Sequence, residues 1–173
     1  VRLTAKAADR AACDALLDVW EARLRSELGS LVFGVDDDTM ESVVLDLLRR
    51  RGWSLGLAES VTGGLLGARL TGVPGASEVF RGSIVSYATD VKHELLGVPA
   101  GPVVSEEAAV AMARGARRVL ACEVALAVTG VAGPTEQDEM PVGTLCVGLV
   151  WPDGEVARTL RLPGDRELMR QFS

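Results

Sequence analysis

The fold of this chain is decided by the stretch Ala58-Glu59-Ser60-Val61-Thr62-Gly63-Gly64, which lies between two apolar runs. The run before it, residues 53–58, predicts a short strand, and the run after it, residues 65–70, predicts a helix. Such a turn places main-chain N–H groups and a hydroxyl at a helix N-terminus, where negative charge is stabilised. Ser60 is therefore a candidate nucleophile, and Gly63 and Gly64 are candidate oxyanion donors. Taken alone, the stretch is also typical of a plain helix cap with a tight turn.

The composition indicates a substantial core and an acidic surface. Of the 173 residues, 48% are hydrophobic and only 4% are aromatic, so Ala, Val and Leu must build the core. The net charge of −6 argues against nucleic acid or an anionic membrane as the main partner, because both favour clustered Lys and Arg. We find no apolar run long enough to span a bilayer and no signal peptide pattern.

Cysteine and histidine are sparse. Cys13, Cys122 and Cys146 are far apart, which favours reduced thiols and a cytoplasmic location over a disulfide framework. His93 is the only histidine and there is no Cys-x-x-Cys pair, so we expect no metal site and no cofactor. Because the first residue is Val1 rather than Met, we expect the chain to be part of a longer protein.

The chain divides into two parts near residue 35. Residues 8–28 have helical apolar spacing and end at Gly29, so we interpret residues 1–35 as a separate helical linker or the end of an upstream module. A second helix is expected to open at residues 36–38, with Asp38 and Glu41 at capping-box spacing. Its expected buried stripe consists of Met40, Val43, Val44, Leu47 and Leu48.

The remainder, residues 36–173, alternates helices with apolar strands. After the 53–58 strand we expect strands at 79–88, 124–128, 142–151 and 155–162, and helices at 89–96, after Ser105 and after Asp165. This order predicts an α/β fold, a three-layer α/β/α domain with a mixed, mostly parallel central sheet. Ligands bind beyond the C-terminal ends of strands in such sheets, where both the Ser60 turn and the loop after Thr129 would lie.

Three ordered motifs together resemble the C-terminal domain of the CinA family, the nicotinamide-nucleotide amidohydrolases. They are residues 58–64 (AESVTGG), residues 86–92 (SYATDVK), and residues 129–134 (TGVAGP) with 141–144 (PVGT). The resemblance covers about residues 36–173. It implies that residues 1–35 join this domain to the upstream part of CinA proteins, where a molybdopterin-binding-like domain lies.

The resemblance implies hydrolysis of the carboxamide of nicotinamide mononucleotide to nicotinate mononucleotide and ammonia, a step of pyridine nucleotide salvage. By motif position Ser60 would be the nucleophile, with Lys92 and Tyr87 as its catalytic partners. Thr129, Gly130 and Gly133 would line the substrate site. The expected partners are a small nucleotide substrate and other copies of the chain in a homo-oligomer.

Amide hydrolysis requires a nucleophile, a base, an acid for the leaving ammonia and oxyanion donors. Lys92 can be the base only if its pKa falls from about 10.4 towards roughly 7–8, which partial burial would achieve. The Tyr87 hydroxyl could orient the proton or relay it. His93 is the easier base by chemistry alone, but neighbouring helical residues point about 100° apart and the motif falls on Lys92. We therefore expect a Ser60–Lys92 pair assisted by Tyr87, with His93 structural or solvated.

Three features of the sequence depart from the family pattern. Val61 stands where the family usually has Cys, the loop 135–140 is acidic where many relatives have Gly and Lys, and the last helix is shorter. Two other hypotheses stay open: a catalytically silent nucleotide-binding or regulatory domain, and a serine–lysine hydrolase for another small amide. Release of ammonia from nicotinamide mononucleotide would distinguish the amidohydrolase hypothesis from these two.

Overall fold

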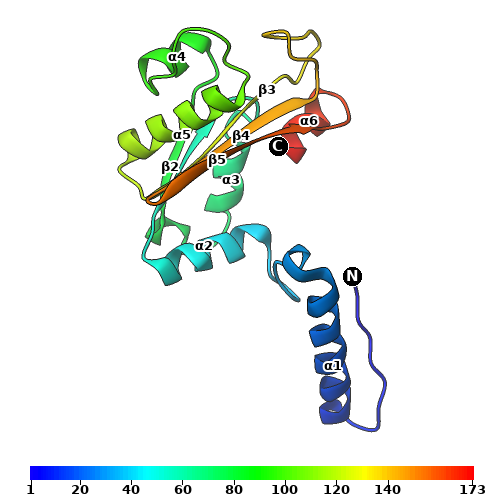
Figure 1. Cartoon of the computed structure of the whole chain (residues 1–173). Helices are drawn as coiled ribbons and strands as arrows, with labels where there is room; N and C mark the ends of the chain where they lie inside the picture. The colour runs from blue at the N-terminus through cyan, green and yellow to red at the C-terminus, as the bar shows by residue number, and fades with distance from the viewer. The chain divides into compact units, whose positions relative to one another are not determined.

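The computed structural model describes all 173 residues, which form two compact units, Val1–Val43 and Val44–Ser173 (Figure 1). The first unit contains the helix α1 (Arg10–Leu28), which is followed by a 3-10 turn at Gly29–Leu31. The Asp9 side chain caps α1 by accepting a hydrogen bond from the Ala12 amide at 2.9 Å. No residue of α1 is buried, so this helix adds nothing to a core.

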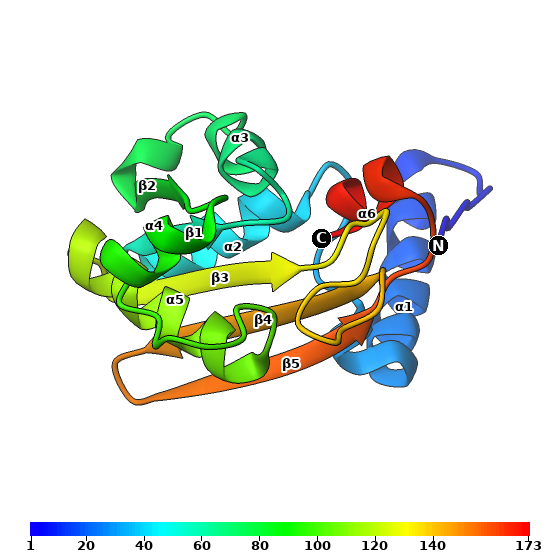
Figure 2. The same ribbon diagram turned by 90° about the horizontal axis from the view of Figure 1, so that it is seen from above.

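The second unit is built on a five-stranded sheet in the order β2-β1-β3-β4-β5 (Figure 2). β1 pairs in parallel with both β2 and β3, whereas β4 pairs antiparallel with β3 and with β5. The predicted mixed sheet is confirmed, but the expectation that it is mostly parallel is wrong: the hairpin of β4 and β5 adds two antiparallel pairings to the two parallel ones. The strands are β1 (Leu55–Glu59), β2 (Phe80–Val85), β3 (Val124–Gly130), β4 (Thr144–Trp151) and β5 (Gly154–Arg161).

Helices cover both faces of the sheet, which confirms the predicted three-layer α/β/α architecture. Side chains alternate between the two faces: Ala58 and Ala125 pack in the cluster that contains α5, whereas Leu57 packs with α2 and α3. Met169 of α6 packs against Val128 on the α2 and α3 side. The helices are α2 (Met40–Arg51), α3 (Leu65–Thr71), α4 (Thr89–Glu94), α5 (Glu106–Leu120) and α6 (Arg166–Phe172).

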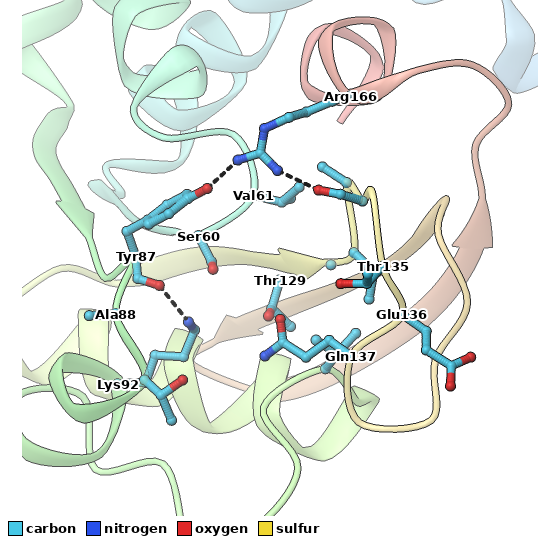
Figure 3. Close-up of a pocket in the computed structure, with 16 residues that line it drawn as sticks. Ser60, Val61, Tyr87, Ala88, Lys92, Thr129, Thr135, Glu136, Gln137 and Arg166 are labelled. Atoms are coloured by element: carbon cyan, nitrogen blue, oxygen red, sulfur yellow. Dashed lines mark hydrogen bonds between the residues drawn. The ribbon is translucent and has the colours of Figure 1, made fainter.

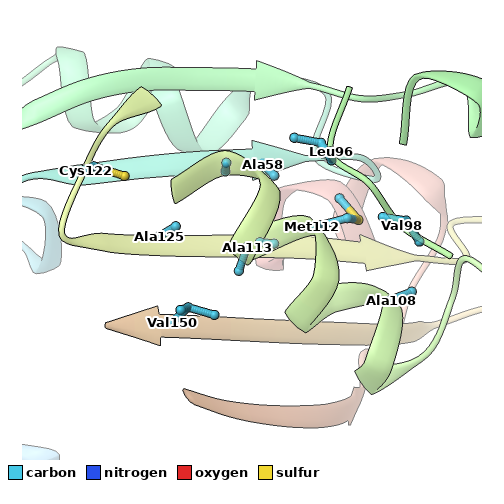
Figure 4. Close-up of a cluster of buried hydrophobic side chains, with 11 residues drawn as sticks. Ala58, Leu96, Val98, Ala108, Met112, Ala113, Cys122, Ala125 and Val150 are labelled. Atoms are coloured by element: carbon cyan, nitrogen blue, oxygen red, sulfur yellow. The ribbon is translucent and has the colours of Figure 1, made fainter. Parts of the chain in front are cut away.

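The core beneath α5 is rich in alanine and contains no aromatic residue (Figure 4). Met112, Ala113 and Ala116 of the helix are fully buried against the strands. Gly148 of β4 lets the helix backbone approach, because a Cβ atom there would lie 2.5 Å from the carbonyl carbon and oxygen of Ala109. Because the core contains few large side chains, α5 packs close to β4.

Of the three helix N-caps predicted from the sequence, two are correct and one is wrong. Ser105 caps α5 through the Ala108 amide at 3.0 Å, and Asp165 caps α6, as expected. The capping box predicted for α2 from Asp38 and Glu41 is wrong: Thr39 and Ser42 exchange main-chain and side-chain hydrogen bonds, and the helix begins at Met40.

The buried stripe predicted for α2 is also partly wrong. Leu45 and Leu48 are the buried residues of this helix, whereas Met40 and Leu47 are about half exposed. The strand predicted at 79–88 ends at Val85, so that Ser86 and Tyr87 lie beyond the sheet. That earlier end frees Tyr87 to reach the edge described below.

Three strands end side by side at one edge of the sheet. Glu59, the last residue of β1, pairs with Val85 of β2 and with Val128 of β3. The Ser60 amide donates to the Val128 carbonyl at 3.0 Å, and the Ser86 amide donates to the Glu59 carbonyl at 2.8 Å. The β1–β2 connection contains α3, whereas the β2–β3 connection contains α5 on the opposite face, so this edge is a topological switch point, where ligands bind in open α/β sheets.

No helix combines the length and the apolar character needed to cross a membrane.

We predict that Gly148→Ala destabilises the second unit by about 1–3 kcal/mol, because the added methyl group overlaps the α5 backbone and forces the helix away from β4. Urea unfolding followed by circular dichroism measures the loss. Gly72→Ala is the control: Gly72 ends α3 with a φ of −68°, its Cβ would lie 3.2 Å from the nearest atom, and the midpoint should barely change. Equal midpoints for Gly148→Ala and wild type would contradict the close approach.

Candidate functional site

A cavity of about 560 Å³ opens at the edge where β1, β2 and β3 end (Figure 3). The turn after β1, the segment after β2 with α4, and the loop after β3 each supply part of its wall. Six residues predicted from the sequence line it: Ser60, Tyr87, Lys92, Thr129, Gly130 and Gly133. The volume is within the usual range for small-molecule sites.

Ser60 lies in the turn that leaves β1 and is almost completely buried at 7% exposure. Its hydroxyl points into the cavity, near the Lys92 side chain and Thr129 (Figure 3). No hydrogen bond joins the Ser60 hydroxyl to Lys92 in this structure; such contacts often tighten only when substrate binds. The serine is therefore placed as a nucleophile would be, at the floor of a cavity.

Gly63 and Gly64 lie outside the cavity lining, and their amides are already used. The Gly63 amide donates to the Ser60 carbonyl at 3.1 Å, and the Gly64 amide donates to the Glu59 carboxylate at 2.9 Å. The expectation that these two glycines supply oxyanion donors disagrees with this geometry. The Val61 amide, next to Ser60, makes no hydrogen bond within the protein and is the better placed donor.

Lys92 of α4 is buried, with 3% exposure. Its Nζ donates to the main-chain carbonyl of Tyr87 at 3.3 Å. Burial lowers the pKa of the Lys92 amine, and the negative charge of Asp138 opposes that shift. The amine is thus more easily deprotonated than a surface lysine, as a general base requires.

Tyr87 meets Lys92 through its carbonyl, whereas its phenol points elsewhere. The Tyr87 hydroxyl accepts a hydrogen bond from the Arg166 guanidinium of α6, and the residue is 56% exposed. Arg166 also donates to the Gly133 carbonyl at 2.8 Å (Figure 3). A proton relay through the Tyr87 hydroxyl is consequently not formed here. The phenol instead joins Arg166, which lines the cavity across from Lys92 (Figure 3).

The loop after β3 is held in place by two side chains. Thr129, with 1% exposure, donates to the Val103 carbonyl at 2.7 Å. Asp138 accepts from the amides of Val103 and Val104 at 2.7 and 3.0 Å, both through its Oδ2 atom. These bonds tie the acidic loop to the segment before α5, and Val104 itself lines the cavity.

His93, adjacent to Lys92, has a structural role. Its Nδ1 lies 2.8 Å from the Val98 carbonyl, so this nitrogen must carry the proton, and the residue does not line the cavity. No group of three or more His, Cys, Asp or Glu side chains is arranged to hold a metal ion.

Sequence reasoning missed Arg166, Asp138 and Gln137. Arg166 and Gln137 line the cavity, and Asp138 lies near enough to Lys92 to influence its pKa. Asp138 and Gln137 belong to the acidic loop that was noted only as a departure from the family pattern. Arg166 follows the Asp165 cap, and its only signal was a cation in the first turn of a helix, where acids are preferred.

Comparison with known proteins shows the family of this chain. A family model described as the CinA C-terminal domain matches residues 37–173. A CinA-like protein of Frankia casuarinae is 52% identical over the whole chain, and one of Geobacter metallireducens is 44% identical. The chain spans 41% and 43% of the lengths of these two relatives.

Solved structures with the same fold include two proteins of this group. The CinA superfamily protein of Escherichia coli matches with a TM-score of 0.74 and 26% identity, over 82% of this chain and 88% of that one. The competence/damage inducible protein CihA of Agrobacterium tumefaciens matches with a TM-score of 0.70 and 31% identity, over 75% and 84%. The family model, the similar sequences and the shared fold lead to one conclusion: the chain belongs to the CinA C-terminal domain family.

Proposed function

We propose that this domain hydrolyses the carboxamide of nicotinamide mononucleotide, with Ser60 as nucleophile and Lys92 as general base. The observation that carries the proposal is the pair itself: a buried serine hydroxyl and a buried lysine amine with a lowered pKa face one cavity. A surface lysine would remain protonated at neutral pH and could not accept a proton. Serine–lysine pairs are an accepted variant of the hydrolytic serine mechanism.

The reaction proceeds in two steps. The neutral Lys92 amine takes the proton of the Ser60 hydroxyl while Oγ attacks the carboxamide carbon. The C–N bond then breaks, the nitrogen takes the proton from Lys92 and leaves as ammonia, and an ester on Ser60 remains. Water, deprotonated by Lys92, attacks this ester, which returns the proton to Ser60 and releases the carboxylate.

The oxyanion of each tetrahedral intermediate needs a donor near Ser60. The amide of Val61 is unused and adjacent to the nucleophile, whereas those of Gly63 and Gly64 are bonded within the turn. One donor of this kind commonly contributes about 3–4 kcal/mol to the transition state. Val61 in place of Cys leaves this main-chain donor unchanged.

The rest of the substrate is expected to extend towards Arg166. This exposed arginine uses two of its five N–H donors on Tyr87 and Gly133, so others remain for a phosphate. Thr135 and Gln137 line the cavity and offer groups for ribose hydroxyls. A substrate with a neutral amide at one end and an anionic group at the other fits this distribution of charge.

We predict release of ammonia from nicotinamide mononucleotide, measured with a coupled glutamate dehydrogenase assay, at a kcat/KM well above that for free nicotinamide. Free nicotinamide lacks the phosphate and ribose that would hold the amide against Ser60. Ser60→Ala is the control for contaminating amidases. Binding of the nucleotide without ammonia release would favour a regulatory domain, and turnover of other small amides alone would favour a different hydrolase.

We predict that Lys92→Ala lowers kcat by about a hundredfold or more, as for loss of a general base. Lys92→Arg should not restore activity, because a guanidinium does not give up its proton at neutral pH. His93→Ala is the matched control on the same helix and should cost far less, since His93 binds only the Val98 carbonyl in this structure. An inactive His93→Ala enzyme together with a nearly intact Lys92→Ala enzyme would refute the mechanism.

We predict that Asp138→Asn moves the acidic limb of the kcat/KM profile to lower pH. The charge of Asp138 raises the pKa of Lys92, so its removal lets the amine lose its proton at lower pH. One oxygen of Asp138 accepts both main-chain bonds, and the oxygen of Asn can accept both as well, so the loop should stay anchored. Glu136→Gln is the control, because Glu136 points away from Lys92 (Figure 3) and its profile should not move. An unchanged profile for Asp138→Asn would exclude this coupling.

A further inference from the structure

Glu59, the residue before the nucleophile, is a fully buried carboxylate. Its Oε2 accepts hydrogen bonds from the Thr62 hydroxyl at 2.7 Å and from the amides of Gly64 and Leu66 at 2.9 and 3.1 Å. Its Oε1 accepts from the Gly67 amide at 2.8 Å and from the Ser83 hydroxyl at 2.7 Å. All five partners donate to Glu59. Three of them are main-chain amides, which can donate a hydrogen bond but cannot accept one.

These bonds connect the three pieces of backbone that bracket Ser60. Thr62 and Gly64 belong to the turn, Leu66 and Gly67 to the start of α3, and Ser83 to β2. The main-chain carbonyl of Glu59 adds a bond from the Ser86 amide, which joins the segment that carries Tyr87. The Glu59 side chain therefore fixes the backbone conformation of residues 60–64.

We propose that Glu59 is a positioning residue, which holds the Ser60 hydroxyl and the Val61 amide in the geometry needed for attack and oxyanion binding. This inference rests on the proposed function for its kinetic part. Glu59 does not line the cavity, so it acts through the turn and does not touch substrate.

The same contacts explain why the N-terminus of α3 is not a phosphate site. The amides that this helix N-terminus would offer an anion are those of Gly64, Leu65, Leu66 and Gly67. The Glu59 carboxylate occupies three of them, and the Leu65 amide donates to the Thr62 carbonyl at 3.4 Å. Gly67 makes room for this group, because a Cβ there would lie 3.3 Å from Oε1 and 3.1 Å from the Ser83 side chain. An anionic part of the substrate must consequently bind elsewhere in the cavity.

Glu59→Gln is the sharpest substitution, because it keeps the shape and exchanges one oxygen for NH2. If the NH2 group takes the place of Oε1, it faces the Gly67 amide. If it takes the place of Oε2, it faces the Gly64 and Leu66 amides. Neither arrangement forms a hydrogen bond, because a main-chain N–H cannot accept one. The turn must shift in either case. Small displacements of reacting groups cost up to about a hundredfold in rate, so we expect at least about a tenfold fall in kcat. The KM for nicotinamide mononucleotide should stay within about twofold, because the binding groups at Arg166 are untouched.

Glu123→Gln is the matched control. Glu123 also receives two hydrogen bonds, from the Ser54 amide and hydroxyl at 2.7 Å each, but lies at the opposite end of β1 and β3. Its loss should lower stability and leave kcat unchanged. If Glu59→Gln fails to fold, Ser83→Ala is the alternative, because it removes a single donor from Oε1. The kcat of Ser83→Ala should fall by less than tenfold, with KM unchanged. A wild-type kcat in Ser83→Ala would then overturn the proposal.

A second measurement separates this inference from the proposed function. The rate at which a fluorophosphonate labels Ser60, followed by intact mass spectrometry with Ser60→Ala as blank, requires no substrate. Slower labelling in Glu59→Gln with a wild-type enzyme inactive on the nucleotide would reject the proposed function and retain the positioning role. Wild-type labelling and kcat in folded Glu59→Gln would overturn the positioning role. If the wild-type protein is not labelled, hydrogen exchange at residues 61–67 decides: faster exchange in Glu59→Gln supports the proposal, and unchanged exchange overturns it.

Discussion

The parallel pairing of β1 with two neighbours is the constraint on which the rest of the domain depends. All five residues of β1 are buried, which is possible only because helices cover both faces of the sheet. The register sets Glu59 beside both Val85 and Val128, so three strands leave the sheet at one place. Ser60, Lys92 and Thr129 belong to segments that are far apart in the sequence, and this pairing alone brings them to one cavity.

The fold was accessible from the sequence because its signals are local. Apolar runs bounded by glycines marked the strands, and Ser105 and Asp165 were correctly identified as caps because each stands alone before a helical pattern. At α2 several acceptable caps are adjacent, and sequence could not rank them. Asp38 turned out to bind the Val35 amide at 3.0 Å, which left Thr39 and Ser42 to form the cap.

The site was accessible only in part, since some roles depend on contacts between distant segments. A Ser–Gly turn at a helix start looks like an anion site, but a carboxylate from the same motif fills it with help from Ser83. The phenol of Tyr87 is directed by Arg166, 79 residues away. The effect of Asp138 on Lys92 likewise depends on where a loop folds back, and the exposed acidic stretch 135–140 carried no local sign of it.

The two ends of the cavity differ in the hydrogen-bond donors that they offer a substrate. Near Ser60, the Gly63 and Gly64 amides are bound to the Ser60 carbonyl and the Glu59 carboxylate, and Val61 is the cavity-lining residue of the turn whose amide stays open for a developing oxyanion. At the other end, Arg166 joins the Tyr87 hydroxyl to the Gly133 carbonyl and retains unused donors. A fully charged group placed against the turn would find one open main-chain donor on a cavity-lining residue, that of Val61, whereas at Arg166 it would find a cation with several donors. We therefore propose that charge orients the substrate before any catalytic step, with its neutral carboxamide against Ser60 and its phosphate at α6.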